Sequence, residues 1–432
     1  MRRHCSFTIS NPFRYKNALF EWSKAFKKVV WLDGNEHVAK YSSFDFLVAV
    51  HEQTDKSISF DSLSPLKSFV GKKQDWLFGF FSYDLKNELE DLVSHNFDGL
   101  DFPVLHFFQP SKIIKCIGQE IHFLYLDEYA NAIQEDHAQI KALMGFEETN
   151  GVHDPIKIKM RIHKDAYFEK INKLLAHIHR GDVYEANFCQ EFYAEDVSIN
   201  PWQTYKRLNA ISEPPFAAFM QLRENYLMCA SPERYIRKQG TTIISQPIKG
   251  TARRDENEAE DEKLKQLLAL DEKERAENIM ITDLVRNDLS KSALKGSVVM
   301  EELCKVYTYK QVHQLISTVV AKVTGYKNPV ELIEETFPMG SMTGAPKISA
   351  MGIIEELEET KRGLYSGAVG YFDPEGNFDF NVVIRSILYN ATNKYVSFSV
   401  GSAITAKSDP EREYQECLLK AKAMRSVLET GG

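Results

Sequence analysis

The chain has 432 residues, of which 43% are hydrophobic and 26% are charged, and its formal net charge is -8. These values are typical of a globular protein, and the length favours two or more domains or one large two-layer body. The negative balance argues against a general binder of nucleic acid or of anionic membranes, because such proteins need a cationic surface.

The N-terminus, Met1 to Ser6, lacks the apolar stretch of a signal peptide, and no run of residues is long enough to span a bilayer. We therefore expect a cytoplasmic protein. The 6 cysteines are scattered without a Cys-x-x-Cys pair. Disulfide frameworks and thiolate zinc sites are both disfavoured by this pattern.

The first part of the chain alternates helical and strand signals. The patterns predict a helix at 18–28, strands at 75–83, 104–108, 113–116 and 121–126, and a helix at 130–144. The polar run at 147–151 then predicts a linker. We therefore divide the chain into an N-terminal region, 1–150, and a second domain, 155–425.

The second domain has clearer signals for where its strands and helices begin and end. The patterns predict strands at 156–162, 241–244, 365–372, 378–388 and 395–400, and helices from 165 to a C-cap at Gly181, at 275–288, from the 340–347 run through 359, and from 409 onward. The turn at 373–377 joins the third and fourth of these strands as a hairpin.

Lys249 lies in the stretch around which the rest of the chain is organised. It follows the β-branched run at 241–244 and stands between Pro247 and Gly250. The fixed φ of proline and the permissive φ of glycine predict a turn there. A lysine on a turn is usually a solvated surface group, but loops at strand ends also carry catalytic groups.

Glu277 is predicted on the apolar side of a helix. It shares one helical face with Met280, Ile281 and Leu284, at positions i, i+3, i+4 and i+7. An unpaired carboxylate on such a face is costly. Glu277 therefore needs a cation, a hydrogen-bond partner or a metal.

A glycine-rich run at 340–347 precedes a predicted helix, with Pro346 in its first turn. Its spacing is not that of a nucleotide P-loop. Exposed N–H groups and the helix dipole favour an anion such as a carboxylate at this position. A tight joint between loop and helix is the alternative.

Two further groups of polar residues lie near the C-terminus. On the predicted strand 378–388, Arg385 faces away from the more apolar side, so it is either a surface residue or a guanidinium that holds a substrate carboxylate. On the last predicted helix, Glu413, Glu416 and Lys420 share one face at i, i+3 and i+7. A solvated helix often has such a face.

Six motifs occur in the order found in one enzyme family. They are Ser-Pro-Glu-Arg at 231–234, Pro-Ile-Lys-Gly-Thr at 247–251, the Ala-Glu-Asn helix at 276–288, Gly-Ser-Met-Thr-Gly-Ala-Pro-Lys at 340–347, Gly-Ala-Val-Gly-Tyr at 367–371 and Glu-Tyr-Gln-Glu at 413–416. Together they resemble the chorismate-utilising enzymes, which include anthranilate, aminodeoxychorismate, isochorismate and salicylate synthases. The resemblance covers 155–425 and extends more loosely to 41–45 and 79–84. Lys249 matches the aminodeoxychorismate synthase component I branch, since anthranilate and isochorismate synthases carry alanine there.

The resemblance implies an α+β fold like that of anthranilate synthase component I, in which two large, mainly antiparallel sheets pack face to face with flanking helices. The site should then lie in the cleft. The substrate would be chorismate, a dianion with an allylic hydroxyl at C4. By resemblance, Glu233 protonates that hydroxyl as it departs and Lys249 adds at C2; ammonia then attacks C4 and expels the lysine. We expect burial and the nearby Arg253 and Arg254 to lower the Lys249 pKa, so that the amine is neutral.

The same resemblance implies a metal and a set of substrate contacts. Glu277 and Glu416, with Glu413 through a water, would hold Mg²⁺. The residues that would grip the substrate carboxylates are Arg385, Lys420, Thr251 and the backbone N–H groups of Gly250, Gly401 and Ser402. His313 matches the active-site histidine of the family, and a hydrogen-bonded core histidine is the alternative.

Two positions depart from the family pattern. Glu185 stands where amine-transferring relatives usually have glutamine and isochorismate synthases have a water-activating lysine. The missing lysine argues against water addition at C2, and the role of a carboxylate there stays open. The stretch 31–34 lacks the serine of relatives that bind tryptophan, so we predict no feedback site.

The chain contains no glutaminase motif. Ammonia should therefore come from a separate glutamine amidotransferase subunit or from free ammonium, and the product would serve para-aminobenzoate and folate biosynthesis through a second enzyme. Two alternatives remain. One is anthranilate synthase component I, which aminates C2 and eliminates pyruvate; the other is a catalytically silent chorismate-binding relative.

Overall fold

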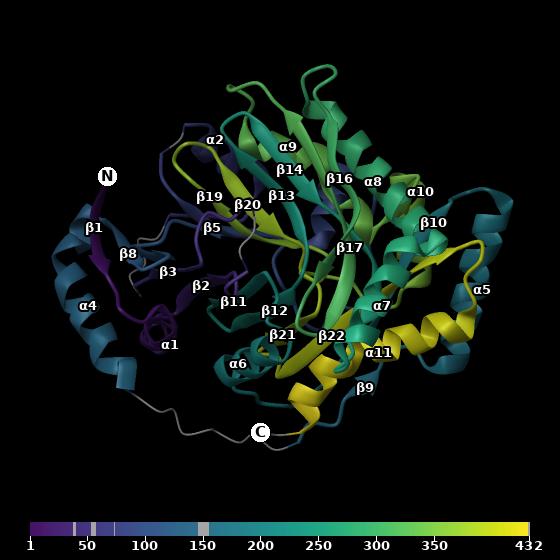
Figure 1. Cartoon of the computed structure of the whole chain (residues 1–432), viewed down its shortest axis with the longest axis horizontal. Helices are drawn as coiled ribbons and strands as arrows, with labels where there is room; N and C mark the ends of the chain where they lie inside the picture. Colours follow the sequence, from purple (N-terminus) through teal and green to yellow (C-terminus); the bar gives the residue numbers. More distant parts are fainter. Residues whose placement is uncertain (38–39, 53–57, 73, 146–154, 431–432) are drawn as a thin grey trace.

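The computed structural model describes residues 1–432 except 38–39, 53–57, 73, 146–154 and 431–432. Two large sheets form its centre, and helices surround them (Figure 1). The strands of both sheets pair antiparallel with their neighbours. The predicted fold class, two mainly antiparallel sheets with flanking helices, is confirmed.

Sheet A, as far as the chain is described, has 12 strands. In spatial order they are β1 (Arg2–Thr8), β8 (Glu120–Leu126), β7 (Lys112–Ile117), β3 (Phe46–His51), β2 (Lys28–Asp33), β11 (Phe216–Leu222), β12 (Asn225–Ser231), β21 (Ser386–Asn390), β22 (Tyr395–Thr405), β10 (Glu185–Ala194) and β18 (Gly344–Ala345), with β9 (Lys159–Met160) also on β10. The long pairing of β10 with β22 brings Glu185 opposite Thr405 and Phe188 opposite Ser402.

Sheet B has 10 strands in the described part of the chain. In spatial order they are β15 (Ile248–Arg253), β17 (Val312–Lys322), β14 (Thr242–Gln246), β13 (Arg234–Gln239), β20 (Phe378–Asn381), β19 (Ala368–Phe372), β5 (Leu77–Phe81), β6 (Leu105–Phe108) and β4 (Ser59–Phe60), with β16 (Val299–Thr308) also on β17. The strand with Lys249 therefore lies at one edge of this sheet.

The helices follow from local capping signals and from apolar faces. They are α1 (Pro12–Ser23), α2 (Leu63–Gly71), α3 (Lys86–Leu89), α4 (Ile133–Ala142), α5 (Lys164–Arg180), α6 (Pro201–Ser212), α7 (Glu258–Leu270), α8 (Glu272–Ser292), α9 (Pro329–Thr336), α10 (Lys347–Leu357) and α11 (Pro410–Glu429), with short 3-10 turns η1 (Tyr83–Leu85), η2 (Asp127–Ala132), η3 (Leu143–Gly145) and η4 (Gly340–Met342). Asn11 and Asp409 accept backbone N–H groups at the starts of α1 and α11, and a proline follows each of them. Gly181 ends α5 in the left-handed conformation, as predicted.

The core lies on both faces of sheet A. Alternate residues along one strand belong to different clusters: Val29 and Trp31 of β2 pack with α1, α4, α5, α6, α10 and α11, whereas Val30 packs with sheet B, α2, α8 and α9. This alternation is expected for a sheet that is covered on both faces. The result is a layered body in which side chains from sheet A, α8 and α11 can reach sheet B.

The predicted boundary near residue 150 lies within 146–154, outside the described residues. Strands that precede it are integrated into both sheets: β2 pairs with β11, and β5 pairs with β19. The N-terminal region thus completes the two sheets on which the site is built.

Several predicted bounds need correction. The helix expected at 18–28 is α1, which ends at Ser23 because residues 28–33 form β2. The strand expected at 156–162 is reduced to the two residues of β9. The strand expected at 378–388 is broken between β20 and β21, and Arg385 in the break has a positive φ of 53°. Strand alternation therefore does not apply at Arg385, and the prediction that the strand continues through this residue was wrong.

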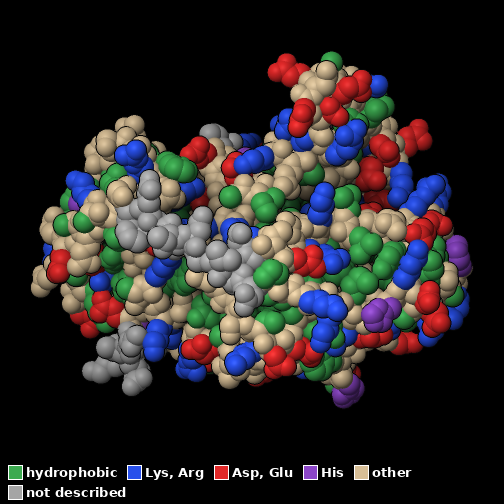
Figure 2. Space-filling model, turned by 90° about the horizontal axis from the view of Figure 1, so that it is seen from below, with side chains coloured by type: hydrophobic (Ala, Val, Ile, Leu, Met, Phe, Trp, Pro, Cys, Tyr) green, Lys and Arg blue, Asp and Glu red, His purple; other side chains and the backbone are tan. Residues whose placement is uncertain are grey.

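Among the described residues, no helix combines the length and apolar character needed to cross a bilayer. On the face seen in Figure 2, basic and acidic side chains are mixed over the surface.

Candidate active site

Lys249 lies on a bulged strand rather than on a turn. In the pairing of β15 with β17, Ile248 lies opposite Ile316 and Thr251 opposite Gln314, so β15 has one extra residue. Gly250 occupies this bulge with a φ of 98°, which favours glycine. A Cβ at Gly250 would also lie 2.9 Å from the Leu315 side chain. The bulge re-aims the neighbouring side chain, and that side chain is Lys249.

The Lys249 amine points into a group of carboxylates. Its Nζ lies 3.6 Å from Oε1 of Glu185 and 3.7 Å from Oε2 of Glu277, and the side chain is 21% exposed. Glu185 comes from β10 of sheet A, and Glu277 comes from α8. Three segments that are distant in sequence therefore meet at one amine, which faces protein groups rather than bulk water.

The expected lowering of the Lys249 pKa is wrong for the free chain. Burial opposes the charged amine, but the negative charges of Glu185, Glu277 and Glu416 outweigh it, so that the pKa is raised. The two arginines expected to repel the proton point elsewhere. Arg253 pairs with Asp255, and Arg254 pairs with Asp261 and donates to the Tyr309 carbonyl.

Glu233, the predicted acid, is buried just after β12. Its carboxylate Oε1 accepts a hydrogen bond from the Ser341 hydroxyl at 2.7 Å. Burial raises the pKa of Glu233 from 4.5 to about 7, although the Ser341 hydrogen bond, an Ile248 N–H and the positive charge of Lys249 act against the rise. A carboxyl with this pKa is partly protonated at neutral pH and can donate a proton.

The glycine-rich run at 340–347 supplies that hydroxyl. It is not a simple helix opening: η4 is followed by β18, whose Ala345 and Gly344 pair with Glu185 and Ala186 of β10. The run therefore links the predicted acid to the strand that carries Glu185. The anion that this run contacts is a carboxylate of the protein, that of Glu233, and the contact is made by Ser341. The sequence did not reveal this role of Ser341.

β22 and α11 bring five of the predicted residues together. The Ser402 hydroxyl donates a hydrogen bond to the Glu413 carboxylate. Lys420 Nζ lies 2.6 Å from Oε1 of Glu416 and donates to the Gly401 carbonyl at 2.9 Å. Burial would raise the Glu416 pKa, but the neighbouring lysines, above all Lys420, lower it. Glu416 is therefore a carboxylate at neutral pH.

The donor set fits Mg²⁺ in its chemistry. Glu277, Glu413 and Glu416 offer carboxylate oxygens, which Mg²⁺ prefers, and Mg²⁺ commonly takes only one or two of them and keeps waters. Glu277 lies 3.7 Å from the Lys249 amine, and the charge of Glu416 on α11 also acts on that amine. Within the described part of the chain, no three His, Cys, Asp or Glu side chains are grouped closely enough to hold a metal alone. A substrate carboxylate and waters would have to complete the shell.

Arg385 lies half-buried in the break between β20 and β21. Its carbonyl accepts a hydrogen bond from the Ala230 N–H at 3.2 Å, which fixes the backbone at the end of β12. Burial lowers the pKa of the guanidinium, and the charge of Glu416 opposes this effect. The charge of an α11 carboxylate thus acts on Arg385, and the role of Arg385 as a substrate clamp stays a prediction. Thr251 is exposed on β15, two residues after Lys249.

His313 is held by other partners. Its Nε2 lies 3.0 Å from Asp261 Oδ1, and its Nδ1 lies 3.0 Å from the Thr308 hydroxyl. Neither partner is among the groups that contact the Lys249 amine, and the active-site role of His313 stays a prediction. Gln314, the next residue, faces the other side of β17 and pairs in register with Thr251. Its buried Oε1 has no hydrogen-bond partner in the described part of the chain.

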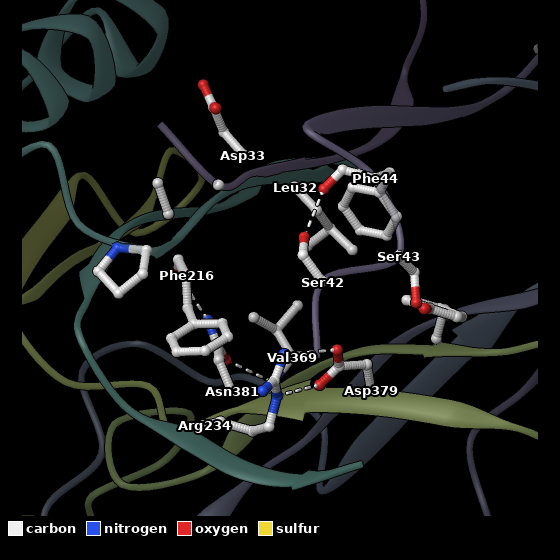
Figure 3. Close-up of a pocket in the computed structure, with 14 residues that line it drawn as sticks. Leu32, Asp33, Ser42, Ser43, Phe44, Phe216, Arg234, Val369, Asp379 and Asn381 are labelled. Atoms are coloured by element: carbon white, nitrogen blue, oxygen red, sulfur yellow. Dashed lines mark hydrogen bonds and ion pairs between the residues drawn. The ribbon is translucent and has the colours of Figure 1, made fainter. Parts of the chain in front are cut away.

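A separate small cavity of about 60 Å³ lies where 31–34 approaches β11 and sheet B (Figure 3). Leu32, Asp33 and Phe216 line it together with Arg234 and Asp379. Arg234 is fully engaged there: it forms two hydrogen bonds with Asp379, at 2.9 and 3.1 Å. The absence of a tryptophan site at this position stays a prediction.

Comparisons with known proteins agree with this geometry. The sequence profile of the family described as chorismate binding enzyme matches residues 17–426. An anthranilate synthase component I-like protein from Synechocystis sp. is 36% identical over 359 residues, which cover 82% of this chain and 72% of that protein. Aminodeoxychorismate synthase component 1 from Klebsiella aerogenes is 33% identical over 392 residues, or 90% of this chain and 84% of that protein.

A solved structure supports the fold. Anthranilate synthase component I from Streptococcus pneumoniae superposes with a TM-score of 0.75 at 24% identity, covering 98% of this chain and 92% of that one. The family profile spans nearly the whole chain, including Glu185, Glu233 and Lys249. This chain therefore belongs to the family of chorismate-binding enzymes.

Proposed function

We propose that this enzyme converts chorismate and ammonia into 4-amino-4-deoxychorismate. The observation that carries the proposal is the placement of Lys249 on a strand bulge, with its amine beside Glu185 and Glu277. Once it has lost a proton, this amine would be the nucleophile, in a site that also contains the raised-pKa acid Glu233. The name of the Klebsiella aerogenes relative points to the same reaction.

In the proposed reaction, Glu233 gives its proton to the C4 hydroxyl, which leaves as water. The Lys249 amine, after it has lost a proton, forms a bond to C2 as both double bonds of the ring shift and the C4–O bond breaks. Ammonia then forms the C4–N bond, both double bonds shift back, and the C2–N bond to Lys249 breaks. Arg385, Lys420, Thr251 and the N–H groups of Gly250, Gly401 and Ser402 would hold the two substrate carboxylates.

Glu277, Glu416 and Glu413, the last through water, would hold Mg²⁺. When bound, the ion would anchor a substrate carboxylate and offset the negative charge of the site. The support for this is the oxygen-only donor set and the charges of the carboxylates on α8 and α11 that act on Lys249.

We further propose that ammonia reaches the site from a glutamine amidotransferase subunit. The support is the word component in the name of the Klebsiella aerogenes relative, which implies a second component there. Free ammonium should replace that subunit in vitro.

The test is product analysis by mass spectrometry after incubation with chorismate, Mg²⁺ and ammonium. We expect an amine at C4 with the enolpyruvyl group retained, and a severe loss or an altered product in Lys249→Ala. Lys273→Ala is the matched control, because Lys273 also pairs with Glu277, at 3.6 Å, but its side chain is 55% exposed.

Anthranilate synthase component I is the second candidate, favoured by the name of the Synechocystis relative. Formation of anthranilate and pyruvate by the wild type would establish it instead. No turnover with intact chorismate binding would identify a catalytically silent relative.

A further inference from the structure

Glu185 has one carboxylate oxygen that the described part of the chain leaves without a partner. The residue opens β10 and is 1% exposed. Its Oε1 faces Lys249 at 3.6 Å, whereas Oε2 is buried without a hydrogen-bond donor. A buried carboxylate oxygen without a donor is costly, and nearly all such groups in proteins find one. The pocket beside Oε2 therefore requires a donor that these residues do not provide.

The charge around this oxygen favours a cation over a neutral water. The Lys249 amine is influenced by four carboxylates, those of Glu185, Glu277, Glu416 and Glu274. Lys273 is the next positive group on α8, and its side chain is 55% exposed. Burial raises the pKa of Glu185 itself, although the charge of Lys249 acts against the rise, so a second cation against Oε2 would favour the ionised carboxylate.

We propose that the free oxygen of Glu185 binds the ammonium ion that supplies the nitrogen of the product. The proposal rests on the proposed function, in which ammonia is a reactant. Ammonium has about the size of one water, carries a single positive charge and donates hydrogen bonds, so it suits an isolated carboxylate oxygen. Mg²⁺ suits this position less, because it demands an octahedral shell of oxygens.

Binding at this oxygen would place the nitrogen beside Lys249. The Glu185 carboxylate would take one proton from the ammonium ion, and the neutral ammonia would then form the C4–N bond as the C2–N bond to Lys249 breaks. It would also keep the reactant on the sheet A side of the site, where Glu185 projects from β10, while α11 holds Glu416 and Lys420 for the substrate. The carboxylate thereby acts as a specificity element for a cationic nitrogen donor over water.

Steady-state kinetics with ammonium chloride as the nitrogen source test this role. In Glu185→Gln, which keeps the shape but removes the charge, we expect the KM for ammonium to rise about tenfold or more, as for the loss of one charge-assisted hydrogen bond. The KM for chorismate should change less than about twofold on the same scale. Glu274→Gln is the matched control: it removes a carboxylate from the same cluster but no buried free oxygen, and should leave the KM for ammonium nearly unchanged.

Equilibrium binding separates this proposal from the proposed function. The NMR line width of ¹⁵N-labelled ammonium, measured without chorismate, should increase with wild type and with Glu274→Gln but not with Glu185→Gln. Equal broadening by wild type and Glu185→Gln, or an unchanged KM for ammonium in Glu185→Gln, would overturn the ammonium site. A wild type that broadens the ammonium line but forms no C4 amine would instead overturn the proposed reaction. Chorismate binding by each variant reports whether its fold is intact.

Discussion

The pKa of Glu233 offers a sharp test of the site. The residue is buried, its pKa is raised to about 7, and its Oε1 accepts a hydrogen bond from Ser341 at 2.7 Å. If Glu233 is the acid, only its protonated form is active, so kcat/KM should fall as the pH rises through about 7. Replacing Ser341 with alanine removes a donor that favours the ionised form, so the pKa should rise further and the falling limb should move to higher pH.

The size of the movement follows from the hydrogen bond. A hydrogen bond to a charged group stabilises by about 1.5 to 3 kcal/mol, and the neutral carboxyl can keep part of it. A difference of about 1.4 kcal/mol between the two forms corresponds to about one pH unit, which is the displacement that we expect for Ser341→Ala. The assay is kcat/KM for chorismate between about pH 6 and pH 9, bracketing both limbs. A limb that stays in place or moves to lower pH would refute the assigned role of Ser341.

The same carboxyl makes stability depend on pH, independently of any chemistry. Between pH 4.5 and about 7, folded Glu233 keeps its proton and unfolded Glu233 has lost it, so the folded state binds more protons. Stability must then fall as the pH rises through this window. The contribution of this group is about 3 kcal/mol, from the change of pKa on folding. Glu233→Gln should remove that fall in chemical denaturation curves, and an unchanged pH dependence would show that Glu233 is not neutral when folded.

Two further predictions concern the scaffold and the metal. Arg362 is buried and forms hydrogen bonds with Glu358 and with the Asn187 and Met342 carbonyls. Arg362→Met should therefore lower the free energy of unfolding by about 3 to 5 kcal/mol. A second change, Glu358→Leu, should recover part of this loss. Urea denaturation of the single and double variants measures this, and equal stability of Arg362→Met and wild type would contradict it. Removal of divalent ions with EDTA should abolish turnover, and Mg²⁺ should restore it. Glu416→Gln should need about tenfold more Mg²⁺, as expected when one ligand is lost; turnover that is unaffected by EDTA would exclude the metal.

Local signals predicted much of this fold. Gly181 ends α5 because the αL conformation costs glycine little, and the alternation in β2 and β11 reflects a sheet that is covered on both faces. These features depend on neighbours in the sequence. The six ordered motifs added the fold class, which composition alone could not select.

Non-local backbone contacts account for the errors. Pro247 and Gly250 suggested a turn, but the Pro247 carbonyl accepts a hydrogen bond from the Ser317 N–H, which keeps β15 paired and converts the irregularity into a bulge. The strand containing Arg385 was expected to continue, but the Val382 N–H bonds to the Glu233 carbonyl and redirects the chain. No pattern within either segment reports such a partner.

A shift of one residue along β17 changes the side of the strand to which a side chain points. Successive residues of β17 point to opposite sides, so His313 turns to Asp261 while Gln314 turns to the other side. The geometry leaves the Gln314 side-chain oxygen without a partner in the described residues, and the active-site role of His313 stays a prediction.

Burial acts in the same sense on Glu233 and Lys249, yet the two groups end in different states. For both, burial disfavours the charged form. Glu233 has few compensating charges and stays partly neutral, as an acid must. Lys249 is surrounded by carboxylates that come from β10, α8 and α11, and it stays an ammonium group. Because a nucleophilic amine must be neutral, Lys249 has to lose a proton after the free enzyme takes up its ligands. The carboxylates around Lys249 stabilise the protonated form of its amine. Their charge must therefore change before the proposed addition at C2 can begin.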